Sequence, residues 1–443
     1  MQKRNLTSGN VTSDLFLVAV PTMMTQLLMF SYSIIDLKFV SILGTKAIAA
    51  VGSATLFIGI GNSLNALSII GTGILVSQIA GKNDKYSYYK VINSGYFINL
   101  IINIMFILVF TIFPKQLLSL INISDASIIE MAVKYLRVFS LAMVFQFTNN
   151  LIIRILTGLG LTNKILLVSL IGVIINIILD ALFINGFGWG VSGAAFASLF
   201  GNCVITIIFF TLYSETLKYS FDIKIDFNVC NKICKLGIPY MLQRFTFTFV
   251  GIVMGRLVAS YGAYAIAAQK IGYQVESITF LVLGGLFSAV SAFSGQNMGA
   301  LQYDRVRKGY KSAIKIGICY TTITSIIFIL FSNNIASIFD DNLLTVKYTE
   351  YYLKTIAFAQ FFVVFEMVGN GFYMGIGKPK IPAINSIVFT TLRIPLAIIL
   401  SQYFGVLGIF ISIAITSIIK GVVSYGIYKF KVFKQIGNKI FSI

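Results

Sequence analysis

Residues 21–52 read PTMMTQLLMFSYSIIDLKFVSILGTKAIAAVG, an apolar stretch that carries one carboxylate, Asp36. The same frame returns 218 positions later in the chain, where Pro21 matches Pro239, Gly44 matches Gly262 and residues 47–50 match residues 265–268. The position that corresponds to Asp36 is Met254. The chain therefore contains two copies of one unit, and the first copy holds an acid that the second lacks.

The composition predicts a membrane protein. Of 443 residues 57% are apolar and only 11% are charged, and the mean hydropathy is +0.88. A soluble domain of this length needs more charge to cover its surface. Apolar runs of about 20 residues recur along the chain, and each is long enough to cross a hydrocarbon layer of about 30 Å as a helix.

Twelve apolar segments predict an all-α polytopic fold with two parallel six-helix repeats around a central cavity. We expect the segments at 15–40, 52–80, 91–113, 132–157, 164–186, 190–213, 236–259, 275–295, 310–332, 347–374, 381–402 and 405–430. The polar stretch 214–235 separates them into an N-terminal lobe (1–213) and a C-terminal lobe (236–443), with a cytoplasmic linker between. Six is an even number, so both lobes enter the membrane in the same direction.

The basic residues predict the orientation. Lys and Arg gather in the loops at one end of the segments, as in Lys82, Lys85, Arg305 and Lys308, and such loops stay in the cytoplasm. We expect an inner (plasma) membrane protein with both termini in the cytoplasm. We also expect no cleaved signal peptide, because residues 2–6 lead directly into the first segment.

Several classes of function are disfavoured. The formal charge of +19 is explained by topology and by anionic lipid rather than by nucleic acid. The chain has no His, and its four Cys are scattered, so we expect neither a cofactor nor a zinc site. An intramembrane enzyme would need a His or a metal-binding Asp cluster, whereas the adjacent pair Asp340 and Asp341 lies in a predicted outer loop. We expect a non-enzymatic monomer in the lipid bilayer.

The motifs resemble those of the multidrug and toxic compound extrusion (MATE) transporters. The resemblance covers roughly residues 15–430 and rests on five stretches in this order: Ile35-Asp36 with 44–52, Ser77–Gly81, Asn176–Asp180 with 193–198, Ala267–Ser277 and Gly295–Gly299. It implies two six-helix lobes, alternating access, and export of amphipathic organic cations or drugs driven by inward Na⁺ or H⁺.

A cation site is predicted in the first lobe. Charged groups within spans are costly and default to functional candidates, and here they are Asp36, Asp180, Glu276 and Glu366. Asn176 and Asp180 share one helical face, and Asp36 and Ser198 are expected at a similar depth. Two close carboxylates need a proton or a cation between them. The resemblance likewise assigns Asp36, Asn176, Asp180 and Ser198 to the ion site. The neutral oxygens favour Na⁺ over H⁺; the alternative role is pairing with Lys38 or helix capping.

The second lobe is expected to differ. Glu276 and Glu366 share it with Arg244, Arg256 and Arg393, which favours charge pairing inside the protein over a complete second ion site.

Three further expectations concern the helix hinges, the substrate cavity and an alternative function. Pro21 and Pro239 interrupt their helices and are candidate hinges. Candidates for lining a substrate cavity are the polar residues Gln26, Tyr32, Asn62, Asn65, Gln269 and Glu276. The alternative function is a lipid-linked oligosaccharide flippase of the same superfamily, which would need a strongly cationic cavity.

Overall fold

The computed structural model describes residues 3–121, 123, 125–220 and 222–432, which form helices and no strand. The ends of the two predicted lobes at residues 1–2 and 433–443 lie outside the described residues. The helices in chain order are α1 (Val11–Ile42), α2 (Thr45–Lys82), α3 (Lys85–Ile112), α4 (Pro114–Ser119), α5 (Ala126–Gly158), α6 (Asn163–Asp180), η1 (Ala181–Gly186), α7 (Gly190–Leu212), α8 (Ser214–Leu217), α9 (Phe227–Ala259), α10 (Ala263–Gly299), α11 (Tyr303–Leu330), α12 (Ser332–Phe339), α13 (Leu343–Gly375), α14 (Lys380–Phe404), α15 (Val406–Ile427) and η2 (Tyr428–Val432).

The predicted all-α membrane fold is confirmed. Eleven helices among the described residues have the length and hydropathy to cross a membrane, and α5, with 33 residues, is another helix of comparable length. Several starts were predicted too late: α10 begins at Ala263 rather than at 275, and α2 at Thr45 rather than at 52. Apolar runs mark only the part of a helix that suits hydrocarbon, whereas α2 and α10 themselves start directly after a glycine turn.

The backbone shows the duplication directly. Gly44 and Gly262 precede α2 and α10 with nearly the same dihedral angles, φ 94° and ψ 174° against φ 96° and ψ 175°. Even the residues without glycine's freedom repeat, because Asn83 and Leu301, again 218 positions apart, both have φ 59°. Further matching pairs are Gly160 (φ 76°) with Gly377 (φ 77°), and Gly190 (φ 58°) with Gly405 (φ 59°). Both halves therefore fold around the same set of left-handed turns.

The chain forms two compact units whose borders fall beside the two prolines. The first comprises residues 1–5 and 24–238, and the second comprises residues 6–23 and 239–443. Pro21 lies inside α1 and Pro239 inside α9. Helix α1 therefore starts in the second unit and ends in the first, and α9 does the reverse.

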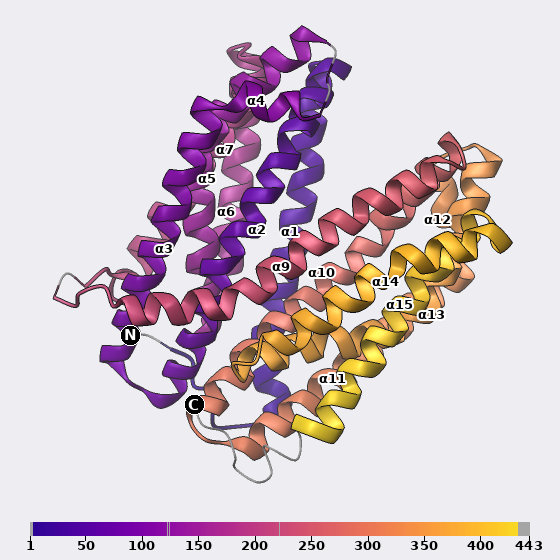
Figure 1. Ribbon diagram of the computed structural model, residues 1–443. Helices are drawn as coiled ribbons and strands as arrows, with labels where there is room; N and C mark the ends of the chain where they lie inside the picture. The colour runs from indigo at the N-terminus through magenta and orange to yellow at the C-terminus, as the bar shows by residue number, and fades with distance from the viewer. Residues whose placement is uncertain (1–2, 122, 124, 221, 433–443) are drawn as a thin grey trace. The chain divides into compact units, whose positions relative to one another are not determined.

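In the first unit α5 is the central helix and packs against α2, α3 and α7, while α6 packs against α7 (Figure 1). A buried amide network joins α2 to α3 and α5, because Asn99 donates hydrogen bonds to Asn65 Oδ1 (2.9 Å) and to the Phe147 carbonyl (3.3 Å). The stretch predicted as a linker belongs to this unit, and the Tyr88 hydroxyl donates to the Thr216 carbonyl at 2.8 Å.

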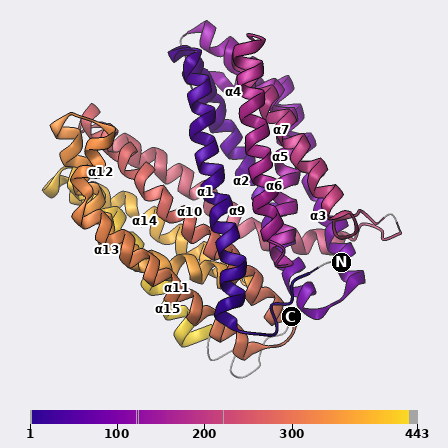
Figure 2. The same ribbon diagram turned by 180° about the vertical axis from the view of Figure 1, so that it is seen from behind.

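The second unit repeats this packing. Helix α13 takes the place of α5 and packs against α10, α11 and α15, and α14 packs against α15 (Figure 2). Its core contains Val250, Met254 and Val258 of α9. Met254, which corresponds to Asp36, is fully buried among apolar side chains. The unit is therefore apolar at the position where the first unit has an acid.

Candidate cation site and buried charge network

Three helices of the first unit deliver the predicted cation-site residues. Asp36 lies six residues before the end of α1, Asn176 and Asp180 lie in the last turns of α6, and Ser198 lies in α7. Asn176, Asp180 and Ser198 are buried with exposed fractions of 5%, 0% and 6%, whereas Asp36 is half-buried. Helix α6 ends at Asp180 and continues as the short π-helix η1, a wider backbone turn that often marks a functional position.

Tyr32 ties this group together. It lies one helical turn before Asp36 on α1, and its hydroxyl is beside the side chains of Ser198 and Asn176. It is also close enough to the carboxylates of Asp36 and Asp180 to interact with both of them electrostatically. The structure thus brings all four predicted ion ligands together, and it adds Tyr32, which we expected only along a substrate cavity.

A glycine on α7 allows the close approach of α6. A Cβ atom on Gly201 would lie 2.9 Å from Asn176 Nδ2 and 3.3 Å from Asn176 Cβ, so any side chain there would push Asn176 aside. Because Gly201 lies one turn after Ser198, it sets the spacing between the amide of α6 and the hydroxyl of α7.

The oxygen atoms of the group are unsatisfied acceptors. Among the described residues, both Asp180 carboxylate oxygens, Asp36 Oδ1 and Asn176 Oδ1 are buried without a hydrogen-bond partner. A buried acceptor without a partner costs about 1–3 kcal/mol, and more when it is charged. Oxygen atoms from carboxylate and amide groups are the ligands that hard cations prefer. The set therefore fits a monovalent hard cation, or a proton shared by the acids. We name this set, with the adjacent Tyr32 and Ser198, the acceptor cluster.

The donor set is unlike a transition-metal site. Within the described ranges no group of three or more His, Cys, Asp or Glu side chains comes together. The acceptor cluster has two carboxylates, and its remaining ligands are neutral oxygens.

The second unit contains a buried network of paired charges. Lys420 Nζ on α15 lies 3.1 Å from Glu366 Oε2 on α13, and both side chains are 5% exposed. Ser386 donates a hydrogen bond to the other Glu366 oxygen at 3.1 Å. Glu276 on α10 accepts from the Tyr352 hydroxyl, and the positive charge of Arg393 is close to it. Two acids and two bases thus balance one another.

The expectation of internal charge pairing is confirmed for Glu366, whose partner is a lysine rather than an arginine, whereas Glu276 accepts a hydrogen bond from Tyr352 and lies near Arg393. Arg244 and Arg256 are exposed, and Glu366 pairs instead with Lys420, a residue outside the predicted set. The sequence did indicate Lys420 as a candidate, because a Lys within an apolar span is as costly to insert into the membrane as an acid.

The candidates for a substrate cavity are divided between the units. Gln26 is exposed, Asn62 is half-buried, and Asn65 is fully buried in the amide network described above. Gln269 and Glu276 belong to the second unit, where both are 5% exposed. Neither unit contains the whole set, so a shared cavity stays a prediction.

Comparison with known proteins supports the same fold. The MatE family model matches residues 21–182 and 239–399, two stretches that begin at the two helix prolines. "Probable multidrug resistance protein YpnP" of Bacillus subtilis is 26% identical over 439 residues, 97% of each chain. "Multidrug export protein MepA" of Staphylococcus aureus is 24% identical over 409 residues, 90% of this chain and 89% of that protein.

Two solved structures share the fold at 21% identity. One is a MOP superfamily transporter from Pyrococcus furiosus, with a TM-score of 0.91 over 99% of this chain and 100% of that one. The other is a multidrug resistance MATE family transporter in an outward-facing conformation, with a TM-score of 0.89 over 98% and 100%. The family model covers well over half of the sequence, in both repeats and in the predicted register. The chain therefore belongs to the MatE family of membrane transporters.

Proposed function

We propose that this protein is a secondary active exporter of amphipathic organic cations, driven by inward movement of Na⁺. The relatives YpnP and MepA are named for multidrug resistance and multidrug export, which supports the substrate class. The acceptor cluster supports the ion. It combines two acids with neutral oxygens, in a membrane-spanning part of the chain where an uncompensated charge is expensive.

The buried oxygen atoms without hydrogen-bond partners favour Na⁺ over H⁺ as the coupling ion. A proton on one carboxylate would satisfy one or two acceptors, whereas a cation between Asp36 and Asp180 is shared by several. Asn176 and Ser198 bind no proton, yet both lie in the cluster beside Tyr32. Each positive charge that enters gains up to about 2.3 kcal/mol per 100 mV of inside-negative potential.

Alternating access needs helices that bend or rotate between two states. Pro21 and Pro239 each remove a backbone hydrogen bond inside a long helix. Both prolines lie beside the border between the two compact units. Ion binding at Asp36 of α1 would therefore act on a helix that belongs to both units, which is a direct route from the ion site to the hinge.

The flippase alternative is less favoured. A flippase for lipid-linked pyrophosphate would need unpaired positive charge within the spans. The buried bases described for the second unit, Lys420 and Arg393, lie beside Glu366 and Glu276, so their charges are compensated.

Export assays in everted vesicles test the proposal. Uptake of a fluorescent organic cation into the vesicle lumen, which corresponds to the cell exterior, is compared under an imposed Na⁺ gradient and an imposed pH gradient, at matched protein level. We expect transport with Na⁺, and its loss in Asp36→Asn and Asp180→Asn. Asparagine keeps the size of the side chain but not the charge. Asp341→Asn, at an exposed loop position, is the matched control and should transport normally.

Asn176→Ala separates the two ions. It should raise the Na⁺ concentration for half-maximal export about tenfold while leaving substrate affinity within twofold, because the amide oxygen is a ligand for the cation alone. Equal export on a pH gradient in Na⁺-free buffer, with Asn176→Ala silent, would establish proton coupling instead.

We further propose that the protein works as a monomer in the plasma membrane with both termini in the cytoplasm. In a cysteine-free background, a cysteine at the exposed position Asn228 should resist impermeant maleimide in intact cells and react in everted vesicles. Labelling from outside in intact cells would refute this orientation.

A further inference from the structure

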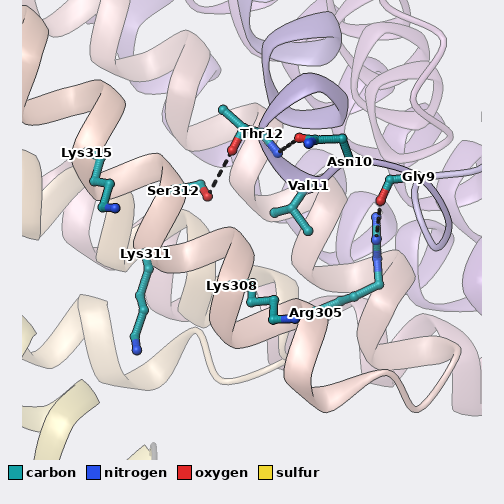
Figure 3. A pocket seen from close by; sticks show the side chains of 9 residues that line it. All are labelled: Gly9, Asn10, Val11, Thr12, Arg305, Lys308, Lys311, Ser312 and Lys315. Atoms are coloured by element: carbon teal, nitrogen blue, oxygen red, sulfur yellow. Dashed lines mark hydrogen bonds between the residues drawn. The ribbon is translucent and has the colours of Figure 1, made fainter.

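A pocket of about 470 Å³ lies within the second unit, between the start of α1 and the first turns of α11. Polar and basic side chains line it together with the apolar side chain of Val11: Asn10 and Thr12 lie on one side, and Ser312 with three lysines on the other (Figure 3). The lysines Lys308, Lys311 and Lys315 come from successive turns of one helix face. None of these residues belongs to the acceptor cluster.

The frame of the pocket is fixed by Arg305. Its guanidinium donates to the carbonyls of Gly9 (2.7 Å) and Leu6 (3.1 Å) and pairs with Asp14 Oδ2 at 3.0 Å. Its side chain is only 18% exposed. Across the pocket, Thr12 donates to Ser312 Oγ at 3.2 Å (Figure 3). Arg305 is thus committed to holding the N-terminal segment against α11, which leaves ligand binding to the lysines.

The three lysines are exposed, and no carboxylate of the described residues lies within 4.0 Å of any of them. The acid at the front of the helix, Asp304, points to Arg307 instead. Three like charges on one helix face repel one another, and an anion with several oxygen atoms would relieve that repulsion while accepting hydrogen bonds.

The surface beyond the pocket indicates where the anion comes from. Past Lys315, α11 exposes Cys319 and Ile323 along the same face, and α1 exposes Phe16 and Val20 beyond Thr12. From Lys315 to Ile323 the helix rises about 12 Å. A charged pocket that continues into an exposed apolar surface matches a lipid, whose phosphate is followed by acyl chains. Basic pockets at the cytoplasmic ends of membrane helices bind anionic head groups in this way.

We propose that this pocket binds the phosphate head group of an anionic phospholipid, with the acyl chains along the exposed apolar faces of α1 and α11. The site is independent of the coupling ion, so it stands or falls separately from the proposed export function.

The test is native mass spectrometry of the purified full-length protein with added phosphatidylglycerol, phosphatidylcholine or inorganic phosphate. The variant Lys308→Gln/Lys311→Gln/Lys315→Gln is compared with Lys218→Gln/Lys224→Gln/Lys232→Gln, which removes three exposed lysines from the first unit. We expect one tightly retained phosphatidylglycerol in the wild type, and affinity weaker by on the order of a hundredfold in the pocket variant, at about 1 kcal/mol per lysine. The control should lose less than threefold.

Two variants keep the result interpretable. Substitution of all three pocket lysines by arginine should retain the lipid, and Lys311→Gln alone should weaken it about fivefold if the triple variant does not fold. The proposal is overturned if both triple glutamine variants lose the lipid equally, or if phosphatidylcholine binds as well as phosphatidylglycerol. It is also overturned if millimolar inorganic phosphate displaces the lipid completely, since free phosphate would then be the ligand.

Discussion

Removing the ammonium group of Lys420 should destabilise the second unit by about 3–5 kcal/mol, because it leaves the buried carboxylate of Glu366 without its counter-charge. The two charged atoms are 3.1 Å apart and both side chains are 5% exposed. At an effective dielectric constant of about 20, two unit charges at this separation attract by roughly 5 kcal/mol. In Lys420→Met, the Glu366 carboxylate keeps its hydrogen bond from the Ser386 hydroxyl but loses its positively charged partner.

The double variant Glu366→Gln/Lys420→Met should cost less than Lys420→Met alone, because no unpaired charge stays buried. We therefore expect a coupling energy of about 2 kcal/mol or more between the two positions. Lys354→Met is the matched control in the same unit. Its ion pair with Glu350 is 46% and 24% exposed, so its loss should cost less than about 1 kcal/mol.

Equilibrium unfolding by SDS in mixed micelles, followed by circular dichroism, measures these values. The single Trp, Trp189, lies in the first unit and reports on that unit through its fluorescence. Lys420→Met should shift the dichroism transition more than the Trp189 transition. The single variant Glu366→Gln completes the comparison. Charge pairing would be refuted if the costs of Glu366→Gln and Lys420→Met add in the double variant, or if Lys420→Met costs no more than Lys354→Met.

Two further predictions concern the first unit. Gly201→Ala should displace Asn176 and raise the Na⁺ concentration for half-maximal export at least threefold. Gly59→Ala is the control and should leave this concentration unchanged, because a Cβ atom at Gly59 has no neighbour within 4 Å. Equal effects of the two variants in the vesicle assay would contradict the packing argument. The Lys90 ammonium beside Asp226 lowers the pKa of that carboxyl below its usual range, so the pair stabilises the docked segment before α9 above about pH 4 and this contribution is lost as the pH falls further. Limited proteolysis at the exposed positions before α9 should therefore accelerate below pH 4 in the wild type, and Asp226→Asn should be proteolysed at a rate that no longer changes over that range.

The two repeats share a backbone but not a charge pattern. Tyr135 and Tyr352 correspond in sequence and are both buried. Tyr352 donates to Glu276, whereas Tyr135 is close to Asp36 and Asp180. In the first unit the buried acids Asp36 and Asp180 thus have no described base beside them, whereas in the second unit Glu366 pairs with Lys420 and Glu276 lies near Arg393. A carboxylate that is already paired with a base does not need a bound cation. The difference in charge pairing between the two units therefore predicts one ion site, in the first unit.

Much of the fold was predictable from the sequence alone. Spans of apolar residues and a repeat of 218 positions determine a duplicated helical membrane fold, because a chain in lipid must satisfy its backbone within each segment. The match between Gly44 and Gly262 was also visible in the sequence, and the structure places both at turns with positive φ angles, which suit no other residue as well. The helical spacing of Asn176 and Asp180 likewise predicted from the sequence that both side chains share one face of their helix.

Other features were decided only by the tertiary structure. The placement of Tyr32 beside Ser198 and Asn176 depends on how α1, α6 and α7 pack, and no sequence pattern encodes that distance. The pairing of Glu366 with Lys420, 54 positions later, likewise arises because α13 packs against α15. Local sequence determines which side chains share a helix face, but only the packing of the helices determines which faces are in contact. Buried charged side chains pair across these contacts, so their partners cannot be identified from local sequence.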